Sequence, residues 1–427
     1  MALIRRPLEL ALLAFPVALL AAALGLMAIV RGGEDPGSTV RIVAIFAAVL
    51  IAFHLTIAIR LPQADQELLP IVETLVALGL IAVDRLVPGL APRQLLWVGL
   101  GSTAATATAV GIPRIDWLGR YRYTWLMGGL LLLALTIVFG IDPNGSQTRL
   151  WIGANGLYFQ PSEITKVVAV IFFASYLADK RDLITHAPIR IGRLSLPPLA
   201  YLGPLVLMWG LSLVLLVWQR DLGVALLFYL IFLFLLYAAT GRTYVGVGIA
   251  FLCVGALVSL ALFDHVQLRT RIWLDPWPSA AGDAYQLVQA LTAYAAGGVL
   301  GAGLGFGYPE YVPAVHTDFV LAALGEELGL LGTIAIVGLY VALVFRAFRI
   351  ALRATSDFAM LFAAGLGTVL GVQALIIMAG NLRLMPITGI TLPFLSYGGS
   401  SILANFVMVG LLLRISAESP SDGGSGG

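Results

Sequence analysis

Hydrophobic residues occupy this chain in long runs of about 15 to 25 residues, without strict alternation and without narrow amphipathic stripes. Each run is long enough to cross a lipid bilayer as an α-helix, which needs about 20 apolar residues. No segment alternates with a period of two, and a spanning segment must satisfy its own backbone hydrogen bonds, so the pattern favours helices over a barrel. We therefore expect an all-α, polytopic membrane helical bundle.

The breaks between the runs are charged or rich in Pro and Gly, and they predict about twelve membrane helices. The expected ranges are 8–30, 40–59, 68–86, 94–112, 123–139, 164–178, 199–217, 222–239, 244–263, 319–345, 358–380 and 392–414. The first run follows two arginines as a signal peptide would, but its apolar stretch is too long for one, so we expect a retained membrane helix. The tail 418–427 is polar and of low complexity, and is expected to be disordered or a cloning scar.

The loops between these helices carry an uneven distribution of basic residues. Lys and Arg are roughly twice as frequent on the side of the two termini, which predicts that both termini are cytoplasmic. The two longest polar connections, 140–163 and 264–318, then lie on the outer face, and their Trp, Tyr, Pro and Gly predict ordered structure with short interfacial helices. We expect N-terminal membrane helices over 1–139, a core membrane domain over 140–417, and chemistry outside the cytoplasmic membrane.

Composition narrows the function classes further. With 60% hydrophobic and 11% charged residues, the chain falls outside the soluble globular class, in which about a quarter of residues are charged. A net charge of +2 with scattered basic residues argues against a nucleic-acid partner. The single cysteine, Cys253, excludes a disulfide framework, and the four histidines show no paired metal-binding spacing. No tightly bound metal is expected.

Ionised side chains within or beside the apolar runs are the candidate functional residues, because a charge at the centre of a lone helix costs about 2.5–3.5 kcal/mol on insertion scales. Glu163 and Lys166 share a helix face, either as an ion pair or as part of a site. Asp221 precedes a run and is either a helix cap or a site residue. Asp318 and Glu326 share one face of the run at 319, and for Glu326 a surface charge pair is the alternative.

Two further residue types leave alternatives open. His316 lies next to Thr317 and Asp318, where it is either a structural hydrogen-bond partner or a proton carrier. Aromatic residues of the long loops, among them Trp151, are either interfacial anchors or a surface that grips a sugar or a lipid headgroup.

These residues fall into three blocks that resemble the SEDS family (shape, elongation, division and sporulation), the group of RodA, FtsW and their sporulation relatives. The blocks are Arg149–Gly153 followed by Gln160–Glu163 and Lys166; His316–Phe319 followed by Gly325–Gly329; and Pro386–Ser401, which contains Ser396. The resemblance covers about 140–414 in the same order. It implies ten membrane helices, so two of the predicted twelve are additional and N-terminal.

The resemblance also implies an activity. Members of this family are peptidoglycan glycosyltransferases that polymerise lipid II outside the cytoplasmic membrane, together with a class B penicillin-binding protein. The residues expected to bind substrate are Arg149, Trp151, Gln160, Glu163, Lys166, Asp221, Arg269, Arg271, His316, Asp318, Glu326 and Ser396. Where the family has its proposed catalytic aspartate this chain has Ser279, which cannot act as a general base at neutral pH, so Asp275 or Asp283 is expected to take that role.

The chemistry that follows is attack by a sugar hydroxyl on a donor sugar whose leaving group is undecaprenyl pyrophosphate. A carboxylate removes the proton, direct displacement inverts the anomeric centre, and cations including Arg220 stabilise the departing pyrophosphate. A Mg²⁺ or Mn²⁺ ion bridging the pyrophosphate is compatible with this chemistry. The alternatives are a lipid II flippase, against which the absence of a convincing internal repeat argues, and a scaffold that activates its partner.

Overall fold

The computed structural model describes residues 6–32, 36–142, 149–154, 157–186, 189–191, 194–196, 199–241 and 245–419, so the expected tail from 420 onward lies outside the described residues. The longer helices are α1 (Pro7–Val30), α2 (Pro36–Arg60), α3 (Leu68–Leu86), α4 (Ala91–Gly111), α6 (Arg122–Phe139), α7 (Pro161–His186), α8 (Leu199–Trp218), α9 (Leu222–Thr240), α10 (Val245–Leu262), α13 (Val320–Leu352), α14 (Asp357–Asn381) and α15 (Gly399–Glu418). Each corresponds to one predicted run. The all-α prediction is confirmed.

Short elements fill the connections. They are η2 (Pro88–Leu90), α5 (Asp116–Arg120), β1 (Ile152–Ala154), β2 (Leu157–Phe159), β3 (Ile189–Ile191), β4 (Leu194–Leu196), α11 (Asp264–Leu274), η4 (Trp277–Ser279), α12 (Tyr285–Gly297) and η5 (Pro309–Tyr311). β1 pairs antiparallel with β2, and β3 with β4, as two separate hairpins. The loop 264–318 therefore holds two short helices, α11 and α12, and is largely ordered.

Within the described residues, nine helices are long and apolar enough to span a membrane. The three predicted spans outside that set are α3, α4 and α8. Helix α3 carries Glu73, Asp84 and Arg85, and α4 is rich in Gly, Ser, Thr and Ala, which lowers its hydropathy. The described apolar part of α8 is Gly203–Trp218, which is short for a span.

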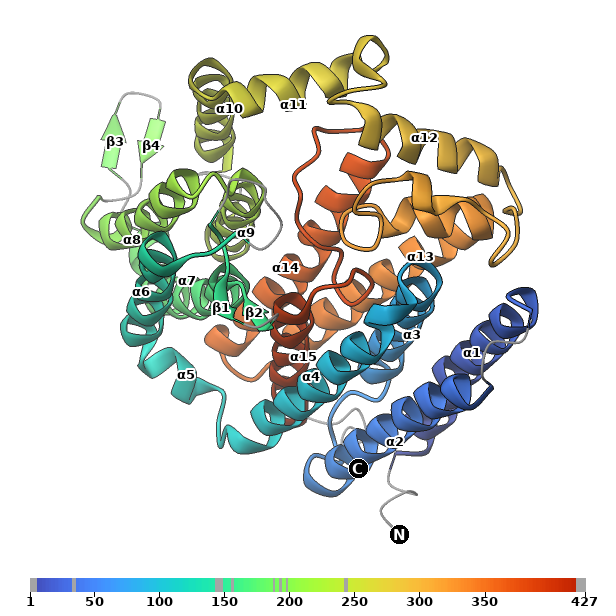
Figure 1. Ribbon diagram of the computed structural model, residues 1–427. Coiled ribbons are helices and arrows are strands. Elements are labelled where there is room, and N and C mark those ends of the chain that lie inside the picture. Colours follow the sequence, from blue (N-terminus) through green and yellow to red (C-terminus); the bar gives the residue numbers. More distant parts are fainter. Residues whose placement is uncertain are drawn as a thin grey trace. The chain divides into compact units, whose positions relative to one another are not determined.

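The chain divides into two compact units, which we describe separately. The first unit combines residues 1–111, 267–346 and 373–417. In it α1 packs against both α2 and α3, and α2 packs against α4 (Figure 1). Glycines bring α15 onto α4: a Cβ added at Gly410 would lie 2.3 Å from the carbonyl oxygen of Ala105. The first unit thus contains α1 and α2, the two helices predicted to be additional, and most of the loop 264–318.

The second unit combines residues 112–266, 347–372 and 418–427. In it α7 packs between α6 and α9 and also contacts α8 (Figure 1). Every side chain from Pro161 to Leu177 of this helix is buried except that of Ile164. Helix α10 contacts α9 and buries none of its residues. The second unit is therefore organised around α7, whose first two turns carry Glu163 and Lys166.

Two helices, α15 and α13, differ from the prediction for a physical reason. The last helix was expected from 392 but begins at Gly399, because residues 392–398 form turns in which Phe394 has a φ of +67°. Helix α13 continues to Leu352 but is broken at Gly329, whose φ is +67°. A Cβ at Gly329 would lie 2.3 Å from the backbone nitrogen of Gly301, so the break lets the loop before α13 lie against the helix.

Candidate active site

The His316–Asp318 block and the Ser396 segment lie together in the first unit. Ser396 Oγ donates to the carbonyl oxygen of Thr317 at 2.5 Å and accepts from the backbone N–H of Leu392 at 3.0 Å. The N–H of Tyr397 donates to the carbonyl oxygen of His316 at 2.8 Å, and their rings lie 5.9 Å apart. Two of the three sequence blocks, about 80 residues apart in the chain, therefore form one hydrogen-bonded substructure.

Gly79 explains how this substructure is held against α3. A Cβ added there would lie 2.6 Å from the carbonyl oxygen of Phe394 and 2.8 Å from that of Leu395. Only a residue without a side chain lets the helix approach the turn this closely. Gln94 of α4 adds a 3.4 Å hydrogen bond from Nε2 to the carbonyl oxygen of Ser396.

Asp318 and Arg269 face the same glycine. A Cβ at Gly389, whose φ is +73°, would lie 3.9 Å from both Arg269 Nη2 and Asp318 Oδ2. Burial raises the pKa of Asp318 to about 6, although the hydrogen bond from Thr317 and the charge of Arg269 act in the opposite direction. Asp318 is therefore a carboxyl group with a raised pKa that lies near the guanidinium of Arg269, and perturbed carboxyl groups are common among functional sites.

His316 is half-buried, and desolvation lowers its pKa below the usual value. In the described structure its backbone carbonyl and its ring contact Tyr397, as noted above. These contacts favour the structural interpretation of His316, and its role toward substrate stays a prediction.

Both candidate bases lie in the loop between α11 and α12. Asp275 follows α11 directly, its N–H donates to the carbonyl oxygen of Arg271 at 2.9 Å, and its Oδ1 accepts from the N–H of Trp277 at 3.4 Å. Asp283 lies in the turn before α12. Both carboxylates are exposed, and so is Arg271. Ser279 ends η4, where its carbonyl oxygen accepts from the N–H groups of Gly282 and Ala284.

Glu326 binds the loop that precedes α13. Its Oε1 accepts from the N–H of Tyr308 at 2.9 Å, while Glu327 accepts from Arg85 Nε at 2.8 Å and from the N–H of Gly305 at 3.1 Å. Both carboxylates are buried. The described contacts of Glu326 are thus with protein backbone, which fits neither a surface charge pair nor a group turned toward solvent. A direct substrate contact stays a prediction.

The remaining block belongs to the second unit. Lys166 Nζ lies 2.6 Å from Glu163 Oε2, and both side chains are buried. Asp221 caps α9, since its Oδ1 accepts from the N–H of Val224 at 3.2 Å, and its Oδ2 accepts from Gln160 Nε2 at 3.4 Å. The cap is confirmed, and the bond to Gln160 connects it to the start of α7.

Arg149 and Trp151 lie in the strand-like segment before this block. Trp151 pairs with Ile141 across an isolated antiparallel bridge that leads into the β1–β2 hairpin. The side chain of Arg149 is exposed and that of Trp151 is partly exposed. Arg220, in the connection from α8 to α9, has a φ of +60°, which is uncommon for a residue with a side chain.

The structure therefore forms two groups from the predicted residues. Arg269, His316, Asp318 and Ser396 lie in one part of the first unit, and Gln160, Glu163, Lys166 and Asp221 lie at the start of α7 and α9 in the second. Sequence reasoning missed the roles of Arg85, which binds Glu327, and of Arg383, which binds the end of α11. Arg383 was visible as a charge just after an apolar run, but no sequence pattern indicates which segment it contacts.

The described residues contain no group of three or more His, Cys, Asp or Glu side chains that could hold a metal ion. The described residues therefore offer no set of three such side chains for a divalent ion that is bound by the protein alone. A metal that accompanies the pyrophosphate of a substrate would take most of its ligands from that substrate.

Comparisons with known proteins agree with this architecture. The family model for FtsW, RodA and SpoVE, described as "Cell cycle protein", matches residues 67–421. Peptidoglycan glycosyltransferase RodA of Mycobacterium tuberculosis is 38% identical over 430 residues, covering 96% of this chain and 90% of the relative. The probable peptidoglycan glycosyltransferase FtsW of Geobacter sulfurreducens is 35% identical over 329 residues, covering 76% of this chain and 85% of the relative.

Solved structures show the same fold. A chain of a peptidoglycan synthase complex, studied for how polymerisation and crosslinking are coordinated, matches with a TM-score of 0.69 and 29% identity, covering 83% of this chain and 97% of that one. The rod shape determining protein RodA of Thermus thermophilus matches with a TM-score of 0.61 and 28% identity, covering 84% and 98%. The chain is a multi-pass membrane protein of the FtsW/RodA/SpoVE family, as its three sequence blocks indicated.

Proposed function

We propose that this protein is a peptidoglycan glycosyltransferase that polymerises lipid II into β-1,4 glycan strands at the outer face of the bacterial cytoplasmic membrane. The observation that carries the proposal is the match over 96% of the chain to relatives named peptidoglycan glycosyltransferase RodA. The geometry supports it, because the Asp318 carboxyl group and the Arg269 guanidinium lie together beside the turn segment 386–398.

The proposed reaction joins two lipid-linked sugars in one displacement. The 4-hydroxyl of an acceptor N-acetylglucosamine attacks the anomeric carbon of the donor, whose bond to undecaprenyl pyrophosphate breaks. Asp275 or Asp283 accepts the hydroxyl proton as the new bond forms, since a sugar hydroxyl is a poor nucleophile. Direct displacement inverts the α-linked donor into a β-linkage without a covalent intermediate. Both carboxylates are solvent-accessible, as a base that must reach an incoming sugar requires.

The leaving pyrophosphate gathers negative charge, and fixed cations stabilise such charge most effectively when they are already oriented. In the first unit, Arg269 is oriented by the carbonyl oxygens of Ile387 and Thr388, and Arg271 is exposed on the same helix. In the second unit, Lys166 is held by Glu163, and Arg149 and Arg220 lie in connections between elements. We propose Arg269 and Arg271 as the first residues to test. A Mg²⁺ or Mn²⁺ ion brought with the pyrophosphate would neutralise the same charge.

The direction of the chain in the membrane is part of the proposal. With both termini cytoplasmic, the loops 140–163 and 264–318 face outward, where lipid II is used. We further propose a class B penicillin-binding protein as the partner that cross-links the product, because one structural match is a chain from a peptidoglycan synthase complex.

The test is reconstitution of the purified protein with a class B penicillin-binding protein in lipid vesicles that contain lipid II. We expect long glycan strands on a gel with the complete complex, and none when Asp275→Asn and Asp283→Asn are combined. Full polymerisation by the double variant would exclude both carboxylates as the base. A chain that supplies lipid II to the opposite leaflet but forms no glycan would instead be a flippase.

A second function, activation of a partner without catalysis, is favoured by one observation: Ser279 stands where the family has its proposed catalytic aspartate. The same vesicles distinguish the two. If the partner alone polymerises lipid II and this chain raises that rate equally with and without its two loop aspartates, the protein is an activator. The enzyme hypothesis requires that the partner alone makes no strands.

A further inference from the structure

Helix α11, which leads into the loop of the candidate bases, docks along the segment that follows α14. Arg269 and Trp273 lie one turn apart on the same face of α11. Arg269 Nη1 donates to the carbonyl oxygens of Ile387 and Thr388 at 3.1 and 3.2 Å. Trp273 Nε1 donates to the carbonyl oxygen of Arg383 at 3.0 Å. The C-terminal half of α11 is thus fixed to this segment through side-chain to backbone bonds.

Arg383 completes the attachment from the other side. Its Nε donates to the carbonyl oxygen of Trp273 at 2.8 Å, and its Nη2 donates to that of Leu274. These are the last two carbonyl groups of α11, which have no partner within the helix and form the negative end of its dipole. A guanidinium group matches them in both charge and geometry, and bonds from an ionised donor are about twice as strong as neutral ones.

The backbone of Arg383 is itself in an unfavourable conformation, with a φ of +57°. A residue with a side chain adopts this region at a cost of order 1 kcal/mol, and glycine or asparagine is the ordinary choice there. The surrounding structure therefore holds an arginine where the local backbone favours another residue. Such a position indicates a role for the side chain beyond the turn itself.

We propose that Arg383 is a positioning residue for catalysis: by binding the two carbonyl groups that directly precede Asp275, it fixes where that carboxylate stands. The inference rests on the proposed glycosyltransferase function and on Asp275 being the base. Asp275 is exposed, and its described bonds are to its own neighbourhood, Arg271 and Trp277. Trp273 and Arg383 therefore form the attachment that orients the start of the Asp275 loop relative to the rest of the first unit.

The expected effect follows from the sensitivity of proton transfer to distance. A base misplaced by about 1 Å can lose on the order of 100-fold in rate, whereas sugar and pyrophosphate binding by other groups is unaffected. Loss of the guanidinium should accordingly lower kcat about 10- to 100-fold, and KM for lipid II should stay within about threefold. An arginine that only stabilises the fold would instead reduce the amount of folded protein and leave kcat per folded molecule unchanged.

The experiment measures lipid II polymerisation by the reconstituted complex with Arg383→Gly, Arg383→Lys and the matched control Leu384→Ala. Glycine suits the positive φ, so Arg383→Gly removes the guanidinium without straining the turn. Leu384 is the adjacent residue and is 71% exposed. We expect the kcat loss in Arg383→Gly, an intermediate kcat in Arg383→Lys, wild-type kinetics in Leu384→Ala, and melting temperatures near wild type. A kcat within twofold of wild type for Arg383→Gly, or for Arg383→Lys should the glycine variant fail to fold, would overturn the proposal.

A double-mutant cycle tests whether the loss of kcat in Arg383→Gly arises through Asp275. If Arg383 acts through Asp275, adding Arg383→Gly to Asp275→Asn lowers the residual rate no further. An undiminished additional loss would show that Arg383 acts elsewhere and would overturn the proposal. Full activity of Asp275→Asn together with no activity of Asp283→Asn would also overturn it, yet would leave the proposed glycosyltransferase function intact.

Discussion

The buried pair of Glu163 and Lys166 can be tested by removing each charge alone and then both together. Their charged atoms lie 2.6 Å apart, and the side chains are 8% and 2% exposed. Removing one member of a buried pair costs about 3–5 kcal/mol, because the other charge stays in a low-dielectric environment, whereas replacing both by apolar residues of similar size is about neutral. We therefore expect Glu163→Leu and Lys166→Met each to lose about 3–5 kcal/mol, and the double variant to be near wild type.

The assay is unfolding in mixed micelles titrated with sodium dodecyl sulfate, followed by tryptophan fluorescence. Arg114 and Asp116 provide the control pair, since they lie 3.4 Å apart in the same unit but are 79% and 45% exposed, so their coupling should be below about 1 kcal/mol. Additive losses in the Glu163 and Lys166 double variant would refute the reasoning. Lipid II polymerisation by the double variant tests whether the pair is also needed for activity. If the double variant is stable but inactive, Glu163 and Lys166 belong to the active site.

Three further predictions follow from single contacts. Gly79→Ala should lower both stability and activity by pushing α3 away from the turn at Phe394, whereas Gly25→Ala, with no atom within 4 Å of its new Cβ, should be neutral or slightly stabilising, as thermal melting of both variants will check. Because the pKa of Asp318 is raised to about 6, the folded state holds more protons than the unfolded state between about pH 4 and 6, so stability should fall as pH rises through that window. The difference in melting temperature between wild type and Asp318→Asn should therefore change across that window, and a difference that is independent of pH would contradict this. Glu327→Ala should destabilise by about 1–3 kcal/mol, since it removes the buried acceptor of a partly buried arginine and of a loop N–H, and an unchanged SDS midpoint would contradict this.

Hydropathy was sufficient to locate the long helices, because a membrane span depends on the average of about 20 residues and tolerates errors at either end. It failed at the start of the last helix, where the apolar residues of 392–398 look helical but form turns packed on Gly79. It also gave no sign of the break at Gly329, which depends on a loop approaching from outside the helix. Such features come from tertiary contacts that no local pattern contains.

In the candidate site, too, local contacts were predictable from the sequence and long-range contacts were not. The cap formed by Asp221 and the pairing of Glu163 with Lys166 were predictable, because each depends on residues three positions apart. The bonds of Arg383 to the end of α11 join residues about 110 positions apart, and a sequence pattern does not specify such pairings.

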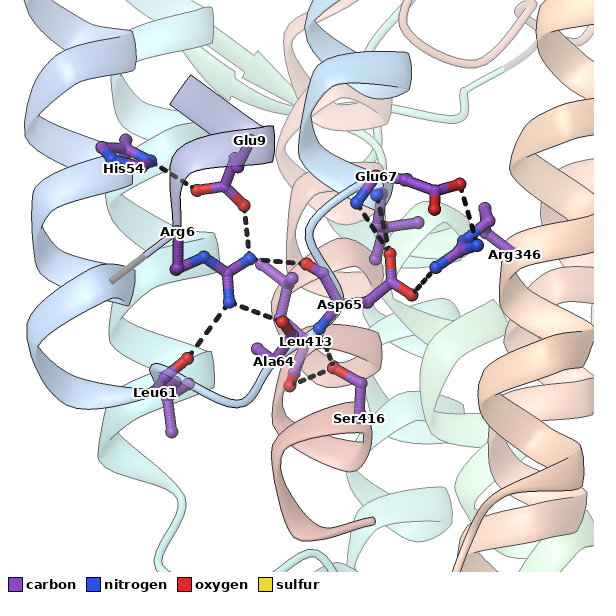
Figure 2. A network of polar contacts seen from close by, with 11 residues as sticks. Arg6, Glu9, His54, Leu61, Ala64, Asp65, Glu67, Arg346, Leu413 and Ser416 are labelled. Atoms are coloured by element: carbon purple, nitrogen blue, oxygen red, sulfur yellow. Dashed lines mark hydrogen bonds and ion pairs between the residues drawn. The ribbon is translucent and has the colours of Figure 1, made fainter. Parts of the chain in front are cut away.

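The two additional helices are attached by a buried polar network in the first unit, drawn in Figure 2. Arg6 donates to Glu9 and to the carbonyl oxygens of Leu61, Ala64 and Asp65, and His54 Nδ1 lies 2.6 Å from Glu9 Oε1. The Asp65 carboxylate binds Arg346 of α13, and its backbone N–H donates to Ser416 Oγ of α15 at 3.0 Å (Figure 2).

This network means that α1 and α2 are not a removable appendage, even though the family model begins only at residue 67. A shortened chain that starts there would lose Arg6 together with the three carbonyl groups it serves. It would also lose the Asp65 carboxylate and its backbone N–H, which contact α13 and α15, so Arg346 would keep Glu67 as its described ion-pair partner. Any functional truncation must therefore place a substitute carboxylate near Arg346, whether from a redesigned start of the chain or from an aspartate introduced nearby, before the shorter version can be compared fairly with its smaller relatives.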